Sequence, residues 1–229
     1  MKAEIMIILK DARKKIEEYN RNYGKYDMAY EFLLTKYRNS GFFIESSGHV
    51  SQETIEIIRH CLENFDMKFI MRKDFSDVLF KKLQPLTSEL QTLKNERFET
   101  VDLTSSKIKE SMRALYDALV EYGANSLHIQ QKRFDVGATK IMHFLHPELF
   151  IMIDSNVADV LKKYYSLPYR SGTLKEYSFD KYHHAMIIYR NEIKLWIDSG
   201  KTLGELLSFD RQPTTVTRAL DKCAYVMND

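Results

Sequence analysis

Two side chains between residues 133 and 165 have the chemistry to act together, the amine of Lys140 and the carboxylate of Asp154. A lysine amine attacks an electrophilic carbon and forms a Schiff base when a desolvated setting lowers its pKa. An aspartate at a helix N-terminus stays ionised and rigid, because N–H groups and the helix dipole favour its charge. Such a carboxylate stabilises positive charge that develops on a sugar carbon, or activates an attacking nucleophile. Lys140 and Asp154 are therefore the candidate catalytic pair.

Each of these residues also has an ordinary interpretation. Asp154 directly precedes a helical pattern, where an aspartate commonly does no more than cap the helix. Lys140 lies close to Phe144 on a helical wheel, which is compatible with partial burial. A solvated position is the alternative, because lysine is rarely buried. The residues alone leave these interpretations open.

The histidines are weaker candidates. His143 and His146 are three residues apart on one expected helix, whereas paired helical ligands more often stand four apart, and Glu148 is the only further ligand type nearby. We therefore expect no metal site, and we expect His143 to pack or to cap. His183 and His184 lie on a long amphipathic pattern, and a catalytic base there is conceivable because histidine titrates near neutrality. No phosphate-binding loop, dinucleotide fingerprint or nucleophile elbow occurs, so no cofactor is expected.

The elements that must position the catalytic pair form a helix, a connector and a second helix. Val136-Gly137 is expected in a tight turn that opens a helix over about 138–146. Residues 149–153 are expected to form a buried connector, because they are almost all apolar. Asp154 then stands at the N-cap of the second helix.

Apolar residues recur at helical spacing along most of the chain, which predicts an all-α, multi-helix globular protein. Eight glycines and four prolines are few, which favours long helices with short links. The chain is expected to form one helical domain over 1–229, with packed subdomains 1–100 and 101–229 as the alternative. Gly24 and Gly123 are expected to end helices. The other expected helices cover about 2–20, 27–38, 51–64, 74–83, 104–122, 178–199, 203–207 and 214–227.

Composition excludes several classes of protein but does not identify a binding partner. The formal net charge is +2 with a sequence pI of about 8.3, which permits nucleic-acid binding without implying it. The cysteines Cys61 and Cys223 are far apart, so neither a disulfide scaffold nor a zinc ribbon is expected. No signal-peptide pattern and no long apolar run occurs, and a cytoplasmic location is the expectation.

Residues 134–165 resemble the helix-hairpin-helix superfamily of DNA glycosylases. Val136-Gly137, Lys140 and Asp154 stand in the order of the hairpin step, the nucleophilic lysine and the helix-capping aspartate of the bifunctional members. The run Asp154-Ser155-Asn156-Val157 followed by Val160-Leu161 is similar to that of adenine-mismatch members, and His143-Phe144-Leu145 to some archaeal 8-oxoguanine members.

The segment also departs from that family's pattern. Asp135 replaces the first glycine of the hairpin, Lys140 falls one residue late, and the distance from Lys140 to Asp154 is shorter than in the bifunctional enzymes. No iron–sulfur cysteine cluster follows. The chain also resembles uncharacterised helical proteins with a Lys-x-x-His-Phe-Leu-x-Pro run and a C-terminal Arg-x-Leu-Asp-Lys helix. The latter is present at Arg218, Leu220, Asp221 and Lys222.

The glycosylase resemblance implies a helix-hairpin-helix core that binds double-stranded DNA and acts on an everted base. It implies that Gly137 belongs to a phosphate-binding hairpin, with Lys132 and Arg133 as phosphate contacts. A solvated basic loop is the alternative for Lys132 and Arg133. Three hypotheses follow: a DNA glycosylase with or without lyase activity, a non-catalytic module that binds nucleic acid or protein, and a structural protein that shares only the helical packing.

Overall fold

The structure is a computed structural model, and it describes residues 5–40, 43–65, 67, 74–126, 134–167 and 178–228. Within these ranges the chain is helical, without a β-strand; Ile44 and Val50 form one isolated antiparallel bridge. The all-α prediction is thus confirmed for the described residues. The α-helices are α1 (Ala12–Tyr23), α2 (Lys25–Asn39), α3 (Gln52–Asn64), α4 (Phe75–Leu83), α5 (Thr87–Leu93), α6 (Ser106–Ser126), α7 (Phe134–Leu145), α8 (Ser155–Tyr165), α9 (Phe179–Asp198), α10 (Leu203–Ser208) and α11 (Val216–Tyr225), with 3-10 turns η2 (Gln84–Leu86) and η4 (Val226–Asn228).

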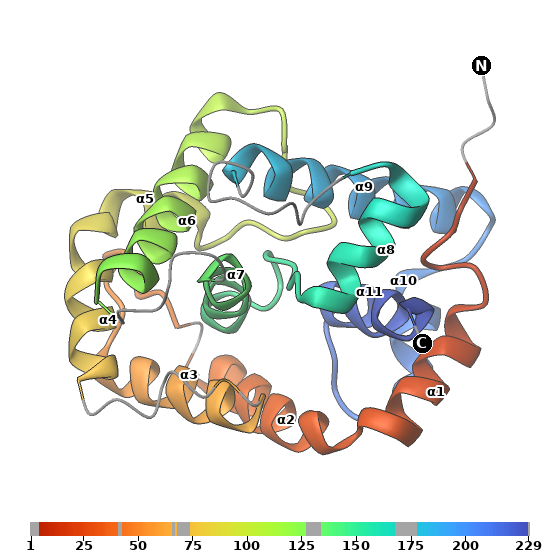
Figure 1. Cartoon of the computed structure of the whole chain (residues 1–229), viewed down its shortest axis with the longest axis horizontal. Helices are drawn as coiled ribbons and strands as arrows, with labels where there is room; N and C mark the ends of the chain where they lie inside the picture. The colour runs from red at the N-terminus through yellow and green to blue at the C-terminus, as the bar shows by residue number, and fades with distance from the viewer. Residues whose placement is uncertain are drawn as a thin grey trace.

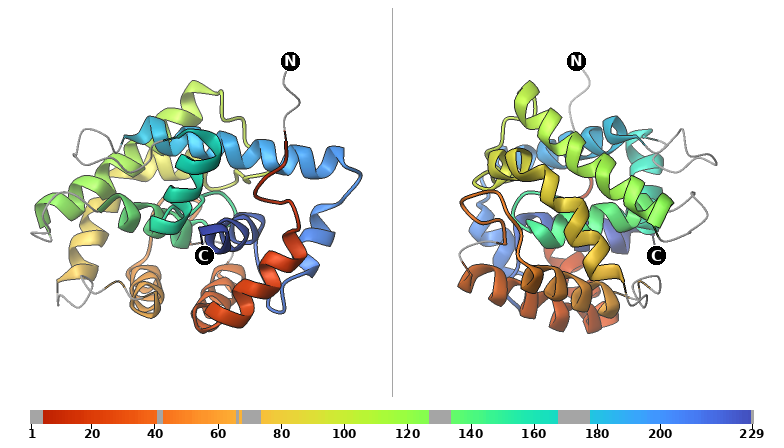
Figure 2. Two further views of the ribbon diagram at one scale, coloured as in Figure 1. Left: turned by 45° about the vertical axis from the view of Figure 1, so that its right-hand side comes forward. Right: turned by 90° about the vertical axis from the view of Figure 1, so that its left-hand side faces the viewer.

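Helix α7 occupies the middle of the molecule, and the other helices enclose it (Figure 1). Helices α2 and α3 lie on one side of it, α9 on the opposite side, and α4 to α6 at one end (Figure 1). At the other end, α8 and α11 pack on each other and α11 packs on α1. The turned views keep α1 to α3 in one layer and α9 in the layer across from it (Figure 2). Residues of α7 therefore contact segments from both halves of the chain.

The central position of α7 follows from its sequence. Every residue from 137 to 146 is buried, because the helix is apolar around most of its circumference. Its polar members are held by specific partners. The Thr139 hydroxyl contacts the carbonyl of Ile153 at 3.3 Å and receives the Ile153 N–H at 3.2 Å. These bonds fix the connector after α7 against the helix itself, and that connector leads directly to Asp154.

The first helix begins later than its sequence pattern predicts. Residues 5–11 are not helical, and α1 starts at Ala12, after Asp11 with a left-handed φ of 58°. The buried carboxylate of Glu192 in α9 accepts the backbone N–H groups of Ile7 at 2.8 Å and of Leu9 at 2.9 Å. The Lys15 ammonium donates to the carbonyl of Ile7. A tertiary carboxylate thus takes up backbone N–H groups of this segment, which overrides its amphipathic spacing.

Two glycine predictions are wrong. Val136-Gly137 does not form a turn before the helix, because both residues lie within the first turn of α7. Gly123 does not end a helix, because α6 continues to Ser126. The helical runs on both sides of each glycine tolerate it without a break. The phosphate-contact predictions for Lys132 and Arg133 fall outside the described residues.

The N-cap predicted at Asp154 is confirmed, and serine side chains cap two further helices. The side chains of Ser51 and Asp154 accept N–H groups at the starts of α3 and α8. Ser178 does the same for α9. Among the described residues, no helix combines the length and apolar character that crossing a bilayer requires.

Replacement of Glu192 by alanine should release the N-terminal segment. The substitution leaves the N–H groups of Ile7 and Leu9 and the hydroxyl of Tyr165, which donates to Glu192 at 2.6 Å, without their acceptor. We expect the free energy of unfolding in urea to fall by about 3 kcal/mol. Hydrogen exchange at the Ile7 and Leu9 amides should accelerate in the same variant.

The control is Glu17→Ala, which removes an exposed carboxylate that pairs with Arg13 on the surface of α1. Its effect should stay below about 0.5 kcal/mol. Equal losses in the two variants would contradict the anchoring role of Glu192.

Candidate functional site

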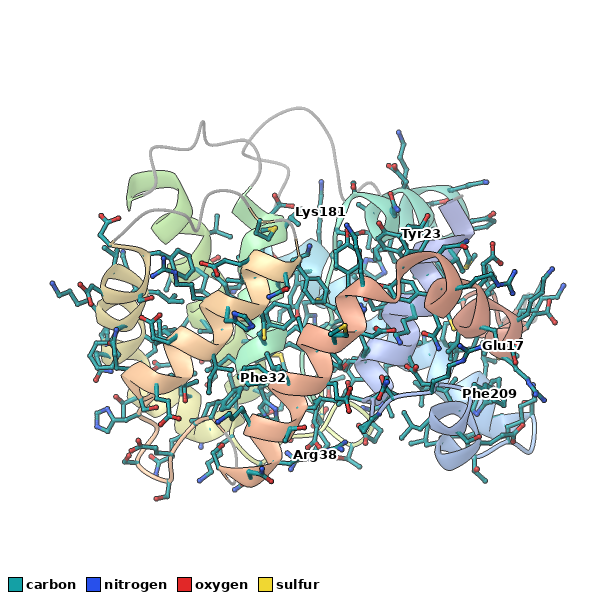
Figure 3. The ribbon with its side chains drawn as sticks, turned by 90° about the horizontal axis from the view of Figure 1, so that it is seen from below. Glu17, Tyr23, Phe32, Arg38, Lys181 and Phe209 are labelled. Carbon is teal, nitrogen blue, oxygen red and sulfur yellow. The ribbon has the colours of Figure 1, made fainter. Side chains whose placement is uncertain are left out.

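One cavity brings together the two residues that the sequence identifies as a catalytic pair. It has a volume of about 50 Å³ and lies where α1, α2, α7, α8 and α11 converge. Figure 3 views the molecule from the side of α2 and α3, with Tyr23 labelled near the junction of α1 and α2. Aromatic, acidic and basic side chains all contribute to the lining, which consists of Tyr19, Tyr26, Phe65, Lys140, Met152, Asp154, Arg218, Asp221 and Tyr225.

Asp154 both caps α8 and lines the cavity. Its Oδ1 atom accepts the N–H of Val157 at 3.0 Å, and its backbone is extended, as an N-cap requires. The side chain is half-buried, so it is neither sealed in the core nor on open surface. The cap occupies one carboxylate oxygen and fixes the direction of the group, while the helix dipole favours its negative charge. A carboxylate held in a fixed direction at the cavity wall is the result.

Lys140 is buried in the lining of the same cavity, so the solvated alternative for this lysine does not hold. Its side chain is 9% exposed, and its Nζ atom lies 5.4 Å from the ring centroid of Phe65. The residue sits in the middle of α7, whose apolar neighbours provide the burial. A primary amine in such surroundings, beside a cavity, meets the geometric requirement for a nucleophile or for electrostatic contact with a ligand.

A fully buried arginine forms the floor of the cavity. Arg218 is 1% exposed and its guanidinium pairs with Asp221 in the next turn of α11. It also donates to the hydroxyl of Tyr19 at 2.7 Å and to Asp27 at 3.3 Å. The Arg218 Cζ atom lies 4.9 Å from the ring centroid of Tyr19, a cation–π distance. Arg218 therefore joins α1, α2 and α11 around the cavity.

The ionic network continues behind Arg218. The ammonium of Lys222 donates to Asp27 at 2.9 Å and to Asp210 at 2.7 Å, and all three side chains are buried. Removing one member of such a network is costly, because its partner keeps an unpaired buried charge. The bend at Gly24 allows α1 and α2 to enclose the network. A Cβ atom at this position would lie 2.6 Å from the Asn20 carbonyl oxygen, which is closer than a nonbonded carbon and oxygen can lie.

Aromatic rings form the remaining walls. Tyr26 stacks on Phe65 with centroids 5.2 Å apart, and Tyr225 meets Tyr19 edge-on at 5.5 Å. Tyr23 lies outside the lining, with its ring 4.9 Å from that of Tyr225. The lining residues Tyr26 and Tyr225 are only half-buried, so they mark the side of the cavity that faces solvent. A planar ligand larger than the present cavity would have to displace these rings.

Burial raises the pKa of Asp221 to about 6, and the charge of Asp154 acts in the same direction. The charges of Arg218 and Lys140 oppose this shift. The same carboxyl thus feels the other three charged groups of the cavity. It exchanges a proton closer to neutrality than an ordinary aspartate does.

His143 of α7 and His146, which directly follows this helix, are both buried in the core. His143 contacts the carbonyl of Phe150 at 2.6 Å and the hydroxyl of Tyr30 at 3.0 Å. Because the carbonyl only accepts, Nδ1–H is the donor and Nε2 accepts from Tyr30 in a neutral imidazole. His146 contacts the hydroxyl of Tyr37 at 2.9 Å. Burial lowers the pKa of each imidazole to about 3. No metal-ligand cluster occurs within the described ranges.

The other histidine candidate also lacks a place in the cavity. His183 contacts the carbonyl of Leu103 at 2.9 Å and His184 is exposed. Neither belongs to the lining, although Arg218 and Asp221 do. Arg218 and Asp221 were not among the predicted site residues and appeared only in the Arg-x-Leu-Asp-Lys resemblance. Their signal is the placement of Arg218, Asp221 and Lys222 at positions i, i+3 and i+4 of a helix whose other residues are apolar or small.

Comparison of the chain with protein-family models, with curated proteins and with solved structures finds no match. The chemistry of the site therefore rests on its own geometry.

Acid should destabilise the protein through its neutral histidines. An unfolded histidine takes up a proton near pH 6.5, whereas folded His143 does so only near pH 3. The contribution of His143 to stability is therefore complete above pH 6.5 and is lost progressively as the pH falls toward 3. Between pH 7 and pH 5 this loss is about 2 kcal/mol. Between pH 7 and pH 5, the free energy of unfolding in urea should therefore fall by about 2 kcal/mol less in the His143→Gln variant than in wild-type protein.

Asp221 acts in the opposite direction, because its folded pKa is raised and acid therefore favours the folded state. This contribution is present in both proteins and cancels in the comparison. His60 is exposed, so His60→Gln is the control and should preserve the full pH dependence. An unchanged pH dependence in His143→Gln would show that folded His143 titrates normally.

Proposed function

We propose that this protein is an N-glycosylase that removes a base everted from double-stranded DNA, with Asp154 as the catalytic carboxylate. The observation that supports the proposal is the meeting of Asp154 and Lys140 in the wall of one cavity. The types and order of these two residues along the sequence predicted them as a candidate pair, independently of the cavity. Their convergence favours joint chemistry over two unrelated ordinary roles.

The proposed role of Asp154 is electrostatic. Breaking an N-glycosidic bond leaves positive charge on the sugar, and a nearby fixed carboxylate lowers the energy of that state. The cap contact with Val157 prepares the group before substrate binds, so no reorganisation is needed during the reaction. Water then attacks the sugar carbon and gives its proton to the carboxylate.

The proposed role of Lys140 is covalent and secondary. Its amine attacks C1′ of the opened abasic sugar, water leaves, and an imine joins protein and DNA. Strand cleavage then follows from the imine, as in lyases. The Nζ atom of Lys140 lies 5.4 Å from the ring centroid of Phe65, a cation–π distance, so the ammonium gives up its proton before the amine attacks.

The aromatic walls suit a base better than a flexible aliphatic ligand. An everted base is held by stacking on aromatic side chains and by contacts to its polar edge. Tyr26 and Tyr225 stand on the solvent side, and binding of a base requires that their rings move aside, because the present cavity of about 50 Å³ is smaller than a base. The ammonium of Lys25 lies 4.7 Å from the ring centroid of Tyr26, where it would meet a DNA phosphate.

Base release from modified duplexes tests the proposal. Duplexes with uracil, hypoxanthine or 8-oxoguanine are incubated with excess protein, and free base is measured by mass spectrometry. Asp154→Asn should reduce the single-turnover rate by about 100-fold or more. Asparagine is as good an N-cap as aspartate, so the fold of α8 should survive. Asp102→Asn is the control: Asp102 also accepts a backbone N–H, from Thr104 at 2.9 Å, but is exposed and outside the cavity.

Borohydride trapping on an abasic duplex separates the two roles. We expect wild-type protein to form a covalent adduct and Lys140→Met, which keeps the side-chain volume, to form none. Base release without an adduct would leave a monofunctional enzyme. Salt-sensitive DNA binding without base release would contradict catalysis and favour a non-catalytic nucleic-acid-binding module.

A further inference from the structure

We propose that Asp221 is the general acid of this site, which protonates the base as it leaves. The inference rests on the proposed glycosylase function and assigns a catalytic role to a second carboxyl group of the cavity. Asp221 lines the same cavity as Asp154 and Lys140. It comes from a different helix, so the two carboxyl groups reach the cavity from separate elements, α8 and α11.

The surroundings of the two carboxyl groups differ, as an acid and a base in one site require. Asp154 is half-buried at a helix N-terminus, where N–H groups and the dipole favour ionisation. Asp221 is 3% exposed and is the sixth residue of α11, away from both ends of that helix. Its one ion-pair partner within the described residues, Arg218, is shared with Asp27 and Tyr19.

The carboxyl groups of the network share their cations. Four carboxyl groups line the cavity or belong to the ion pairs behind it, namely Asp27, Asp154, Asp210 and Asp221. Arg218 is shared by Asp27 and Asp221, and Lys222 is shared by Asp27 and Asp210. Carboxylates that share one buried cation repel each other, and a proton bound to one of them relieves that repulsion.

The pKa of Asp221, raised by burial to about 6, identifies this group as the one that holds the proton. Titratable groups of every helix around it act on it or on its partner. They are Arg218 of α11, Lys140 of α7, Asp154 before α8, Tyr19 of α1, Asp27 of α2 and Tyr189 of α9.

The reaction balances with these groups. The C1′–N bond breaks and its electron pair goes to the base. The proton of Asp221 passes to a ring nitrogen of the departing base. The sugar then carries one positive charge and Asp221 one negative charge, so the site keeps its total. Water adds to C1′ and Asp154 accepts the released proton. A cationic sugar thus replaces a proton as the counter-charge of the four carboxyl groups.

The test is the pH dependence of single-turnover base release with whichever of the three modified duplexes wild-type protein cleaves. Wild-type rates should fall about tenfold per pH unit above pH 6, as Asp221 loses its proton. Asp221→Asn should be about 100-fold slower at pH 5.5 and should lack this fall, so the two proteins converge near pH 8. The control is Glu192→Gln, a buried carboxylate outside the cavity, which should keep the wild-type profile.

Direct titration makes the inference independent of the folding of any variant. Carboxyl carbon NMR of wild-type protein should give a midpoint near 6 for Asp221. A midpoint below 4, or an Asp221→Asn profile equal to that of active wild-type protein, would overturn the role of Asp221 alone. Failure of wild-type protein to release any of the three bases would overturn the glycosylase proposal and this inference with it.

Discussion

The burial of the Arg218 guanidinium is the constraint on which the site depends. A charge that is 1% exposed is tolerable only with close partners, and Tyr19, Asp27 and Asp221 supply them from three helices. Meeting this requirement fixes the bend between α1 and α2 and the rotation of α11 about its axis. The cavity is what remains between these helices and α7. Its polar walls are therefore a consequence of how the protein neutralises one buried cation.

The side chain of Asp154 serves both the fold and the site. Capping α8 requires a carboxylate directly before the helix, and the buried connector held by Thr139 places that carboxylate at the cavity. The structural interpretation and the functional one are therefore compatible, and the cap contact is the reason for rigidity. Lys140 differs from Asp154, because an apolar residue of similar volume would fill the same position in α7 without placing a charge there.

Local patterns predicted the elements, and long-range contacts decided what the patterns could not. The spacing in α9 and the caps at Ser51, Asp154 and Ser178 are local features, so they were predictable. The non-helical start of the chain was not, because Glu192 lies about 180 positions away from the N–H groups it binds. The spacing of Arg218 and Asp221 within α11 is a local signal, but their partners Asp27 and Tyr19 on other helices could not be predicted from it. Lys140 and Asp154 were identifiable because both lie in one short segment.

The central claim is that this cavity favours a positively charged sugar, and affinity for charged and neutral abasic analogues tests it most directly. Duplexes carry either a cationic pyrrolidine or a neutral tetrahydrofuran in place of one nucleoside, and dissociation constants are compared at one salt concentration. Because a transition-state mimic binds more tightly than a neutral analogue, we predict a preference of at least ~10-fold for the pyrrolidine duplex, lost in Asp154→Asn. Equal affinity of wild-type protein for the two duplexes would contradict the account.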